Sequence, residues 1–198
     1  MHPQLYLASR SPRRQELLRQ VGLHFEVLPA DVDERRAPGQ SPADYAVAMA
    51  GAKAAAARPP QRLPVLGADT DVVIDGEILG KPAGRDEALA MLARLSDRTH
   101  EVFSAVAVSH DGRVETALSV TRVTFGAIAP AQAAAYWDSG EPADKAGAYA
   151  IQGLGARFVK RIEGSYSGVM GLPLYETLEL LGRFGVQSTF DIRHSTFA

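Results

Sequence analysis

Apolar and polar positions alternate in blocks along the chain, and the blocks have the lengths and periods of short strands and helices. Apolar runs of four or more residues, bounded by turn residues, indicate strands. Strands are predicted at 5–9, 24–32, 63–69, 71–74, 77–79, 100–109, 113–125 and 157–164. The 63–69 run, LPVLGAD, stays apolar up to Asp69, which is typical of a strand buried on both faces.

Two Ser-Pro pairs, at 11–12 and 41–42, match a helix N-cap followed by proline at the first helical position. Apolar residues at helical spacing follow the first pair, and an alanine-rich stretch of high helix propensity follows the second. Helices are predicted at 12–21, at 42–58, in a segment ending near 96, at 130–140 and at 173–184.

The alternation of strands and helices predicts the α/β class, with a mixed, twisted sheet flanked by helices. Hairpin turns at Asp75-Gly76 and at 110–112 make some neighbouring strands antiparallel. No repeat or long linker divides the chain, so residues 1–186 are expected to form one domain. The stretch 187–198 shows no periodicity and is expected to be a mobile tail.

Composition narrows the classes of function. The 198 residues carry a net charge of −2, so a general nucleic-acid binder is not expected. Cysteine is absent, which excludes disulfides, thiolate nucleophiles and cysteine zinc sites. The five histidines have no metal-ligand spacing. Because the sequence shows neither a signal-peptide pattern nor an apolar run of membrane-spanning length, we expect a soluble cytoplasmic protein without a membrane partner.

Arg13 and Arg14 fall in the first turn of a predicted helix, at the positive end of its dipole. A basic residue there is disfavoured by roughly 0.3–1 kcal/mol. Together with Ser9 and free backbone N–H groups, the two arginines point to a site for an anion such as phosphate. The alternative is that both are solvated surface residues.

Asp69 ends a buried strand, where open α/β sheets place their ligands. Such a carboxylate can bind Mg²⁺ or accept a proton from water, although it can also simply cap a turn. Lys81 protrudes from a Gly-Lys-Pro loop, and Lys53 is the one lysine of the alanine-rich helix. A solvated helix face is the alternative reading of Lys53.

The stretch DKAGAYAIQG, from Asp144 to Gly153, is a glycine-rich loop that can approach a ligand closely. Its Gln152 has an amide suited to pairing with the edge of a base, although the glycines could merely make turns. Cations and carboxylates on separate loops suit a polyphosphate bridged to the protein by a metal ion.

Five motifs in order, LASRSPRRQELL, GADT, GKP, DKAGAYAIQG and GSYSGVMGLPL, closely resemble the Maf family, also called septum formation inhibitor proteins or nucleoside triphosphate pyrophosphatases. The resemblance extends to about Val186. It implies a mixed α/β fold related to the inosine-triphosphatase class, with two lobes around a cleft. It further implies metal-dependent hydrolysis of a nucleoside triphosphate to the monophosphate and pyrophosphate, and a homodimer by analogy.

By position in these motifs, Asp69 matches the family's proton acceptor, and Asp69 and Glu34 match carboxylates that hold Mg²⁺ or Mn²⁺. The residues that match the phosphate-binding groups are Ser9, Arg13, Arg14, Lys53 and Lys81. Arg14, Thr70 and Gln152 resemble the branch that acts on dTTP and UTP. The competing hypothesis is a regulator of septum formation and cell division that binds a nucleotide without turning it over.

Asp71 departs from the family's pattern, because an apolar residue is common after the GADT motif. An extra metal ligand and a solvated residue at the strand edge are the two interpretations, and the sequence favours the second.

Overall fold

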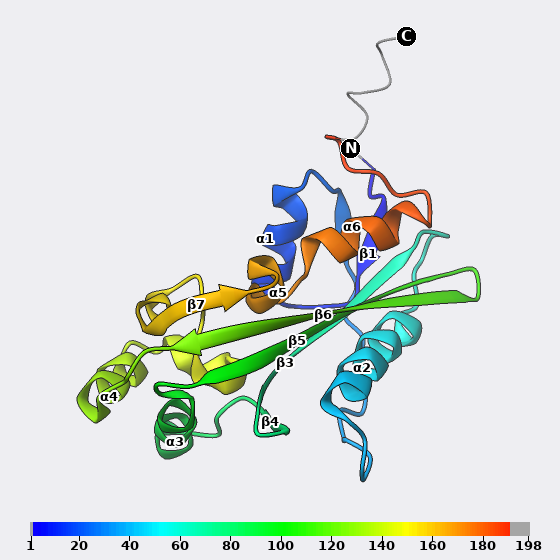
Figure 1. Ribbon diagram of the computed structural model, residues 1–198. Coiled ribbons are helices and arrows are strands. Elements are labelled where there is room, and N and C mark those ends of the chain that lie inside the picture. Colours follow the sequence, from blue (N-terminus) through cyan, green and yellow to red (C-terminus); the bar gives the residue numbers. More distant parts are fainter. Residues whose placement is uncertain (1, 191–198) are drawn as a thin grey trace.

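The computed structural model describes residues 2–190 (Figure 1). Within this range seven strands form one sheet in the order β2-β1-β3-β5-β6-β7, with β4 beside the end of β3. β1 pairs in parallel with β2 and β3, and the other pairs are antiparallel. The strands are β1 Leu5–Leu7, β2 Phe25–Val27, β3 Val65–Ile74, β4 Glu77–Leu79, β5 Thr99–His110, β6 Arg113–Phe125 and β7 Val159–Glu163. The prediction of a mixed α/β sheet is confirmed.

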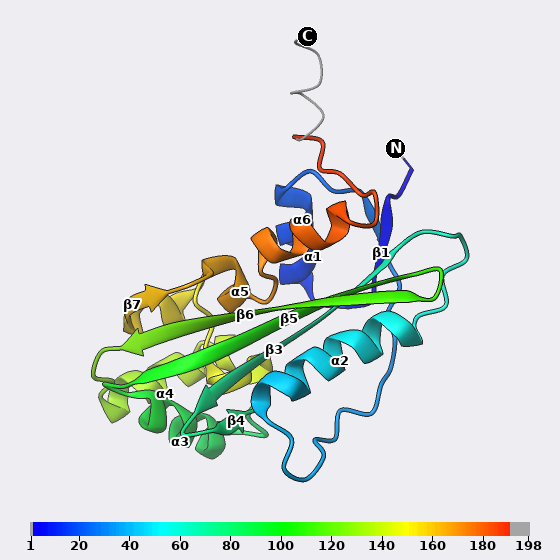
Figure 2. The same ribbon diagram turned by 45° about the vertical axis from the view of Figure 1, so that its right-hand side comes forward.

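Helices cover both faces of this sheet. They are α1 Pro12–Gln20, α2 Pro42–Ala56, α3 Arg85–Leu95, α4 Pro130–Asp138, α5 Tyr166–Met170 and α6 Leu174–Gly182. Between α4 and β7 run three 3₁₀ turns, η1 Glu141–Asp144, η2 Ala146–Ala148 and η3 Leu154–Phe158. Helix α2 lies on one face of β3, β5 and β6, and α1, α5 and α6 lie on the other (Figure 2). No helix between residues 2 and 190 is both long and apolar enough to cross a bilayer.

The side chains of β3 alternate between these two faces. Leu66 and Ala68 pack in a core with α1 and α6, whereas the odd-numbered positions face α2. Gly67 permits α2 to lie close, because a Cβ atom there would come within 2.6 Å of the Ala54 backbone nitrogen. The absence of a side chain at Gly67 therefore leaves room for α2 to pack directly against β3.

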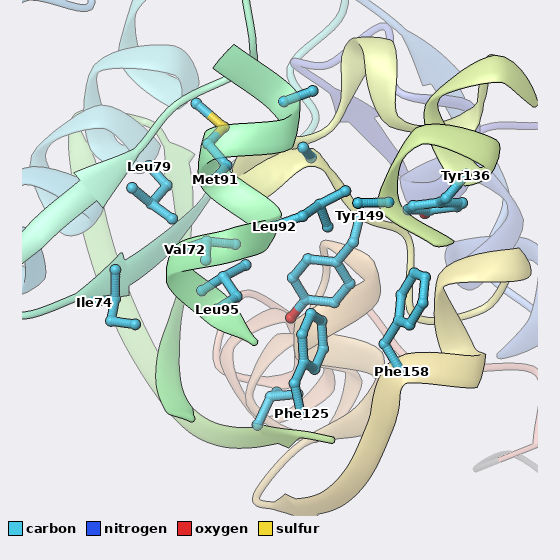
Figure 3. Close-up of a cluster of buried hydrophobic side chains, with 14 of the residues drawn as sticks. Val72, Ile74, Leu79, Met91, Leu92, Leu95, Phe125, Tyr136, Tyr149 and Phe158 are labelled. Atoms are coloured by element: carbon cyan, nitrogen blue, oxygen red, sulfur yellow. The ribbon is translucent and has the colours of Figure 1, made fainter. Parts of the chain in front are cut away.

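Two large hydrophobic cores lie at opposite ends of the sheet. One gathers side chains of β1, β3, α1 and α6, including Leu7, Leu18 and Leu181. The other gathers β4, α3, α4 and the segment before η3. Its aromatic part, with the Phe125 and Tyr149 ring centroids 4.8 Å apart, is drawn in Figure 3. Each core supports one lobe of the molecule.

The two lobes meet where one edge of β3 is left without a partner strand. β1 pairs with Val65 and Leu66, and β4 pairs with β3 again only from Val72 onward. Among the described strands, none pairs with residues 67–71 on this edge. Of this stretch, Asp69, Thr70 and Asp71 line the space between the lobes.

Four segments differ from the sequence-based expectations. The strands predicted at 63–69 and 71–74 form the single strand β3, because its pairing with β5 runs without a break from Val65 to Val73, so Asp69 lies within a strand and does not end one. The strand predicted at 24–32 is limited to β2, since Pro29 lacks the N–H that a further ladder bond requires. Helix α5 was not expected, because five residues with a glycine show no apolar period. Of the expected tail, residues 187–190 are described: the Ser188 hydroxyl donates to the Val21 carbonyl over 2.6 Å. The remainder, 191–198, lies outside the described residues.

The close approach of α2 predicts that Gly67→Ala destabilises the protein by about 1–3 kcal/mol, since the added methyl meets the backbone of α2. The free energy of unfolding from urea titration measures this. Gly51→Ala is the matched control, because Gly51 lies within α2 with open space around it, so alanine should stabilise the helix by up to about 1 kcal/mol. Equal effects of the two changes would contradict the packing described here.

Candidate active site

A cleft of about 1350 Å³ opens between the lobes over the unpaired edge of β3. It receives residues from the loop before α1, from α1 itself, from the loop before α2, from β3, from the loop after β4 and from the 3₁₀ segment. All of the residues singled out in the sequence line it: Ser9, Arg13, Arg14, Glu34, Lys53, Asp69, Thr70, Lys81 and Gln152. The structure therefore brings together groups spread over more than 140 positions of the chain.

Lys53 joins the two carboxylates that the family resemblance assigns to a metal. Its Nζ lies 2.7 Å from Asp69 Oδ1 and 2.8 Å from Glu34 Oε1. The Lys53 and Asp69 side chains are only 14 % and 13 % exposed, so neither a solvated helix face nor a simple turn cap describes them. Burial lowers the pKa of Lys53, but the two carboxylates outweigh burial and raise it above the ordinary lysine value. Lys53 is therefore a protonated, positively charged ammonium group at neutral pH.

The loop that carries Glu34 is itself tied to α2, because the Tyr45 hydroxyl donates to the Glu34 carbonyl oxygen over 2.7 Å. The hydrogen bond from Lys53 to the Glu34 carboxylate lowers the pKa of Glu34. Helix α2 therefore positions Glu34 through its backbone and through its side chain.

Asp71 is not the solvated edge residue that the sequence favoured. It is 8 % exposed, and its Oδ2 is buried with no hydrogen-bond partner among the described residues. The physical reason is the period of the strand: Asp71 follows Asp69 by two positions and so points to the same covered face of β3. Burial, and then the neighbouring Asp69 carboxylate, raise the pKa of Asp71 to about 8. The spacing of Asp69 and Asp71 was the signal in the sequence for this carboxylate pair.

Arg14 approaches the cleft from the opposite face of β3. Its Nε donates to the Gly171 carbonyl over 2.8 Å, and its Nη1 and Nη2 donate to the hydroxyls of Ser9 and Thr70 over 3.2 and 3.3 Å. These three acceptors explain why Arg14 stands in the first turn of α1, where the helix dipole disfavours a positive charge. Sequence reasoning missed Gly171, since a backbone carbonyl acceptor leaves no mark in the residue pattern.

Arg13 and Lys81 are the cations of the cleft that remain available. Among the described residues that line it, the other basic side chains each have a carboxylate, carbonyl or hydroxyl partner, whereas these two have none. They extend from opposite lobes, Arg13 from α1 and Lys81 from the loop after β4. A multiply charged anion bound between the lobes would meet both of them.

Gln152 lines the cleft from the turn between η2 and η3, and it is exposed. The neighbouring Lys145 is ion-paired with Asp144. The cleft thus holds cations available for phosphate, a partly buried carboxylate, Asp69, and an exposed amide, Gln152. These groups suit hydrolysis of a nucleotide polyphosphate.

The raised pKa of Asp71 predicts how the stability of the protein depends on pH. A carboxyl group whose pKa is higher in the folded state loses its stabilising contribution as pH rises from about 4, its unfolded value, to about 8. Asp71→Asn removes this loss. We therefore expect the variant to gain stability over the parent protein between pH 5 and pH 9, by about 1–3 kcal/mol.

Urea unfolding at several pH values in the presence of EDTA measures the difference. Asp138→Asn, at the exposed end of α4, is the control and should show a constant difference. A pH-independent difference for Asp71→Asn would contradict the burial of an ionisable pair at Asp69 and Asp71.

Comparison with known proteins agrees with the motifs in the chain. The family model described as "Maf-like protein" matches residues 4–184. The chain is 54 % identical over 188 residues to the dTTP/UTP pyrophosphatase of Saccharophagus degradans, covering 92 % of this chain and 89 % of that protein. It is also 54 % identical over 185 residues to the dTTP/UTP pyrophosphatase of Methylobacillus flagellatus, covering 92 % and 93 %.

Among solved structures, the Ham1 protein of Staphylococcus aureus is 16 % identical with a TM-score of 0.47, over 91 % of this chain and 96 % of that one. The family match spans both lobes and every residue of the cleft named above. The chain belongs to the Maf family.

Proposed function

We propose that the protein hydrolyses dTTP and UTP to the nucleoside monophosphates and pyrophosphate, with Mg²⁺ or Mn²⁺ as cofactor. The chain is an enzyme of the nucleoside triphosphate pyrophosphatase class. The choice of dTTP and UTP is supported by the names of the relatives and by Arg14, Thr70 and Gln152, the residues through which the chain resembles the branch acting on these nucleotides.

The observation that carries the proposal is the arrangement of charge in the cleft. Among the described residues Arg13 and Lys81 have no partners and approach from opposite lobes, and the partly buried carboxylate of Asp69 lines the same cleft from β3. A triphosphate needs cations along its length, and hydrolysis needs a proton acceptor for water at one phosphorus. A protein that only bound the nucleotide would need no proton acceptor beside the phosphates.

The residues of the cleft fit a divalent cation. Asp71 Oδ2, next to Asp69, is a buried oxygen with no hydrogen-bond partner between residues 2 and 190, and oxygen donors are the ligands Mg²⁺ prefers. Between residues 2 and 190 no group of three or more His, Asp or Glu side chains is arranged as a metal site. This agrees with Mg²⁺ sites that use one or two carboxylates together with substrate phosphates. Asp69 and Glu34 would hold the ion, which when bound neutralises phosphate charge and orients water.

In the reaction, the Asp69 carboxylate accepts the proton of the water that attacks the α-phosphorus. Lys53 fixes the orientation of Asp69 through their 2.7 Å ion pair. Arg13 and Lys81 stabilise the negative charge that grows on the departing pyrophosphate. Ser9 and Thr70, both held by Arg14, border the same space from the other face of β3.

A panel of dTTP, UTP, CTP, ATP, GTP and 7-methyl-GTP tests the proposal. We expect pyrophosphate and monophosphate to be released from dTTP and UTP with Mg²⁺, at a kcat/KM at least about tenfold above the other nucleotides, and no release in EDTA. Turnover of 7-methyl-GTP in their place would reject the specificity assigned to Arg14, Thr70 and Gln152. Binding of nucleotides without any turnover would instead favour a regulatory protein.

Asp69→Asn should lower kcat about 10²–10⁴-fold, because the amide cannot accept the proton of the attacking water. Lys53 retains Glu34 as a partner in this variant, so the fold should persist, as circular dichroism and the thermal midpoint can verify. Asp138→Asn, remote from the cleft, is the control for loss of a carboxylate. Near-normal turnover by Asp69→Asn would exclude Asp69 as the proton acceptor.

A further inference from the structure

Glu141, the first residue of η1, binds three groups at once although it does not line the cleft. Its Oε1 accepts from the Tyr136 hydroxyl over 2.6 Å and from the Gly155 amide over 3.0 Å. Its Oε2 accepts from the Leu154 amide over 2.8 Å. Burial raises the pKa of Glu141, but these hydrogen bonds outweigh burial and lower it, so the group is a carboxylate at neutral pH.

The Tyr136 hydroxyl extends this set of contacts to the other end of the same loop. It accepts from the Ala150 amide over 3.0 Å while it donates to Glu141. Its ring packs against Phe158, with centroids 5.3 Å apart, and both rings are labelled in Figure 3. The Tyr136 ring is therefore held in place by the hydrophobic core of the second lobe.

Residues 150 and 154 are thus both fixed, directly or through Tyr136, to the carboxylate of Glu141. Between them lies Gln152, whose exposed side chain lines the cleft. Gly153 contributes by having no side chain, because a Cβ atom there would collide with the Glu141 carboxylate. These contacts hold the backbone on both sides of Gln152.

We infer that Glu141 is a positioning residue for base selectivity: by clamping the backbone at Ala150, Leu154 and Gly155 it holds the Gln152 amide where it pairs with the base of the nucleotide. The inference rests on the proposed function, since it takes Gln152 as the contact to the base. Glu141 touches no substrate, and its effect is expressed through Gln152.

Glu141→Gln tests this role, because the amide keeps the volume of the side chain but presents an NH₂ group to backbone N–H donors. We expect the selectivity, the ratio of kcat/KM for dTTP to that for GTP, to fall at least about tenfold. The fall should come from a higher KM for dTTP, with kcat changed by less than about threefold, because the groups around Asp69 are untouched.

A double-mutant cycle with Gln152→Ala separates positioning from general support of the fold. If Glu141 acts through Gln152, Glu141→Gln should change selectivity by less than about twofold once Gln152 has been removed. A merely structural role would lower activity toward all nucleotides equally in both backgrounds. An unchanged selectivity in Glu141→Gln, or an equal loss in the Gln152→Ala background, overturns the inference.

Gly153→Ala provides a second route to the same displacement without changing a polar atom. Its φ of −111° is accessible to alanine, so the effect comes from the collision with Glu141 and not from backbone strain. It should reduce selectivity in the same direction as Glu141→Gln. Glu163→Gln, an exposed glutamate ion-paired with arginines on β6 and β7, is the matched control and should leave selectivity unchanged.

The cycle is measured by turnover and also by calorimetric binding of dTTP and GTP. A parent protein that hydrolyses neither nucleotide would reject the proposed function, and the binding cycle would then still decide the role of Glu141. A parent protein that is active and selective, with Glu141→Gln equally selective, would reject the inference alone.

Discussion

The interruption in the pairing of β3 is the constraint on which the site depends. β1 is three residues long and leaves β3 after Leu66, and β4 joins it only at Val72. The opposite edge of β3 is paired with β5 throughout this stretch, so the strand is held in the sheet along that edge. A strand with one free edge can present both of its faces to the same cleft. Asp69 and Thr70 point to opposite faces of β3 and still border one cavity.

On each face of β3 a basic side chain from a different helix contacts a residue of the strand. On one face Lys53 reaches Asp69 because Gly67 lets α2 approach closely. On the other face Arg14, from the first turn of α1, reaches Thr70. These paired charges organise the cleft, whereas the cations without partners, Arg13 and Lys81 among the described lining residues, are available to an anionic ligand. Burying Asp71 beside Asp69 costs stability, which is typical of sites that bind cations.

Much of this architecture could be predicted from the sequence. The Ser-Pro pairs placed the starts of α1 and α2, the hairpin turns placed β3, β4, β5 and β6, and the motifs identified the lining of the cleft. What the sequence could not supply was the consequence of packing. Asp71 read as a solvated residue because burial of its face depends on α2, which lies elsewhere in the chain. The role inferred for Glu141 depends on contacts made 13 and 14 residues later, and no local pattern records these.

We propose that water attacks the α-phosphorus of the nucleotide, with Asp69, at the free edge of β3, as the acceptor of its proton. Hydrolysis of dTTP in water enriched in ¹⁸O, followed by mass spectrometry of both products, shows which phosphorus the water attacks. Attack at the α-phosphorus places one heavy oxygen in the thymidine monophosphate and none in the pyrophosphate. Heavy oxygen found in the pyrophosphate would mean that water attacks the β-phosphorus, and would contradict this account of the site.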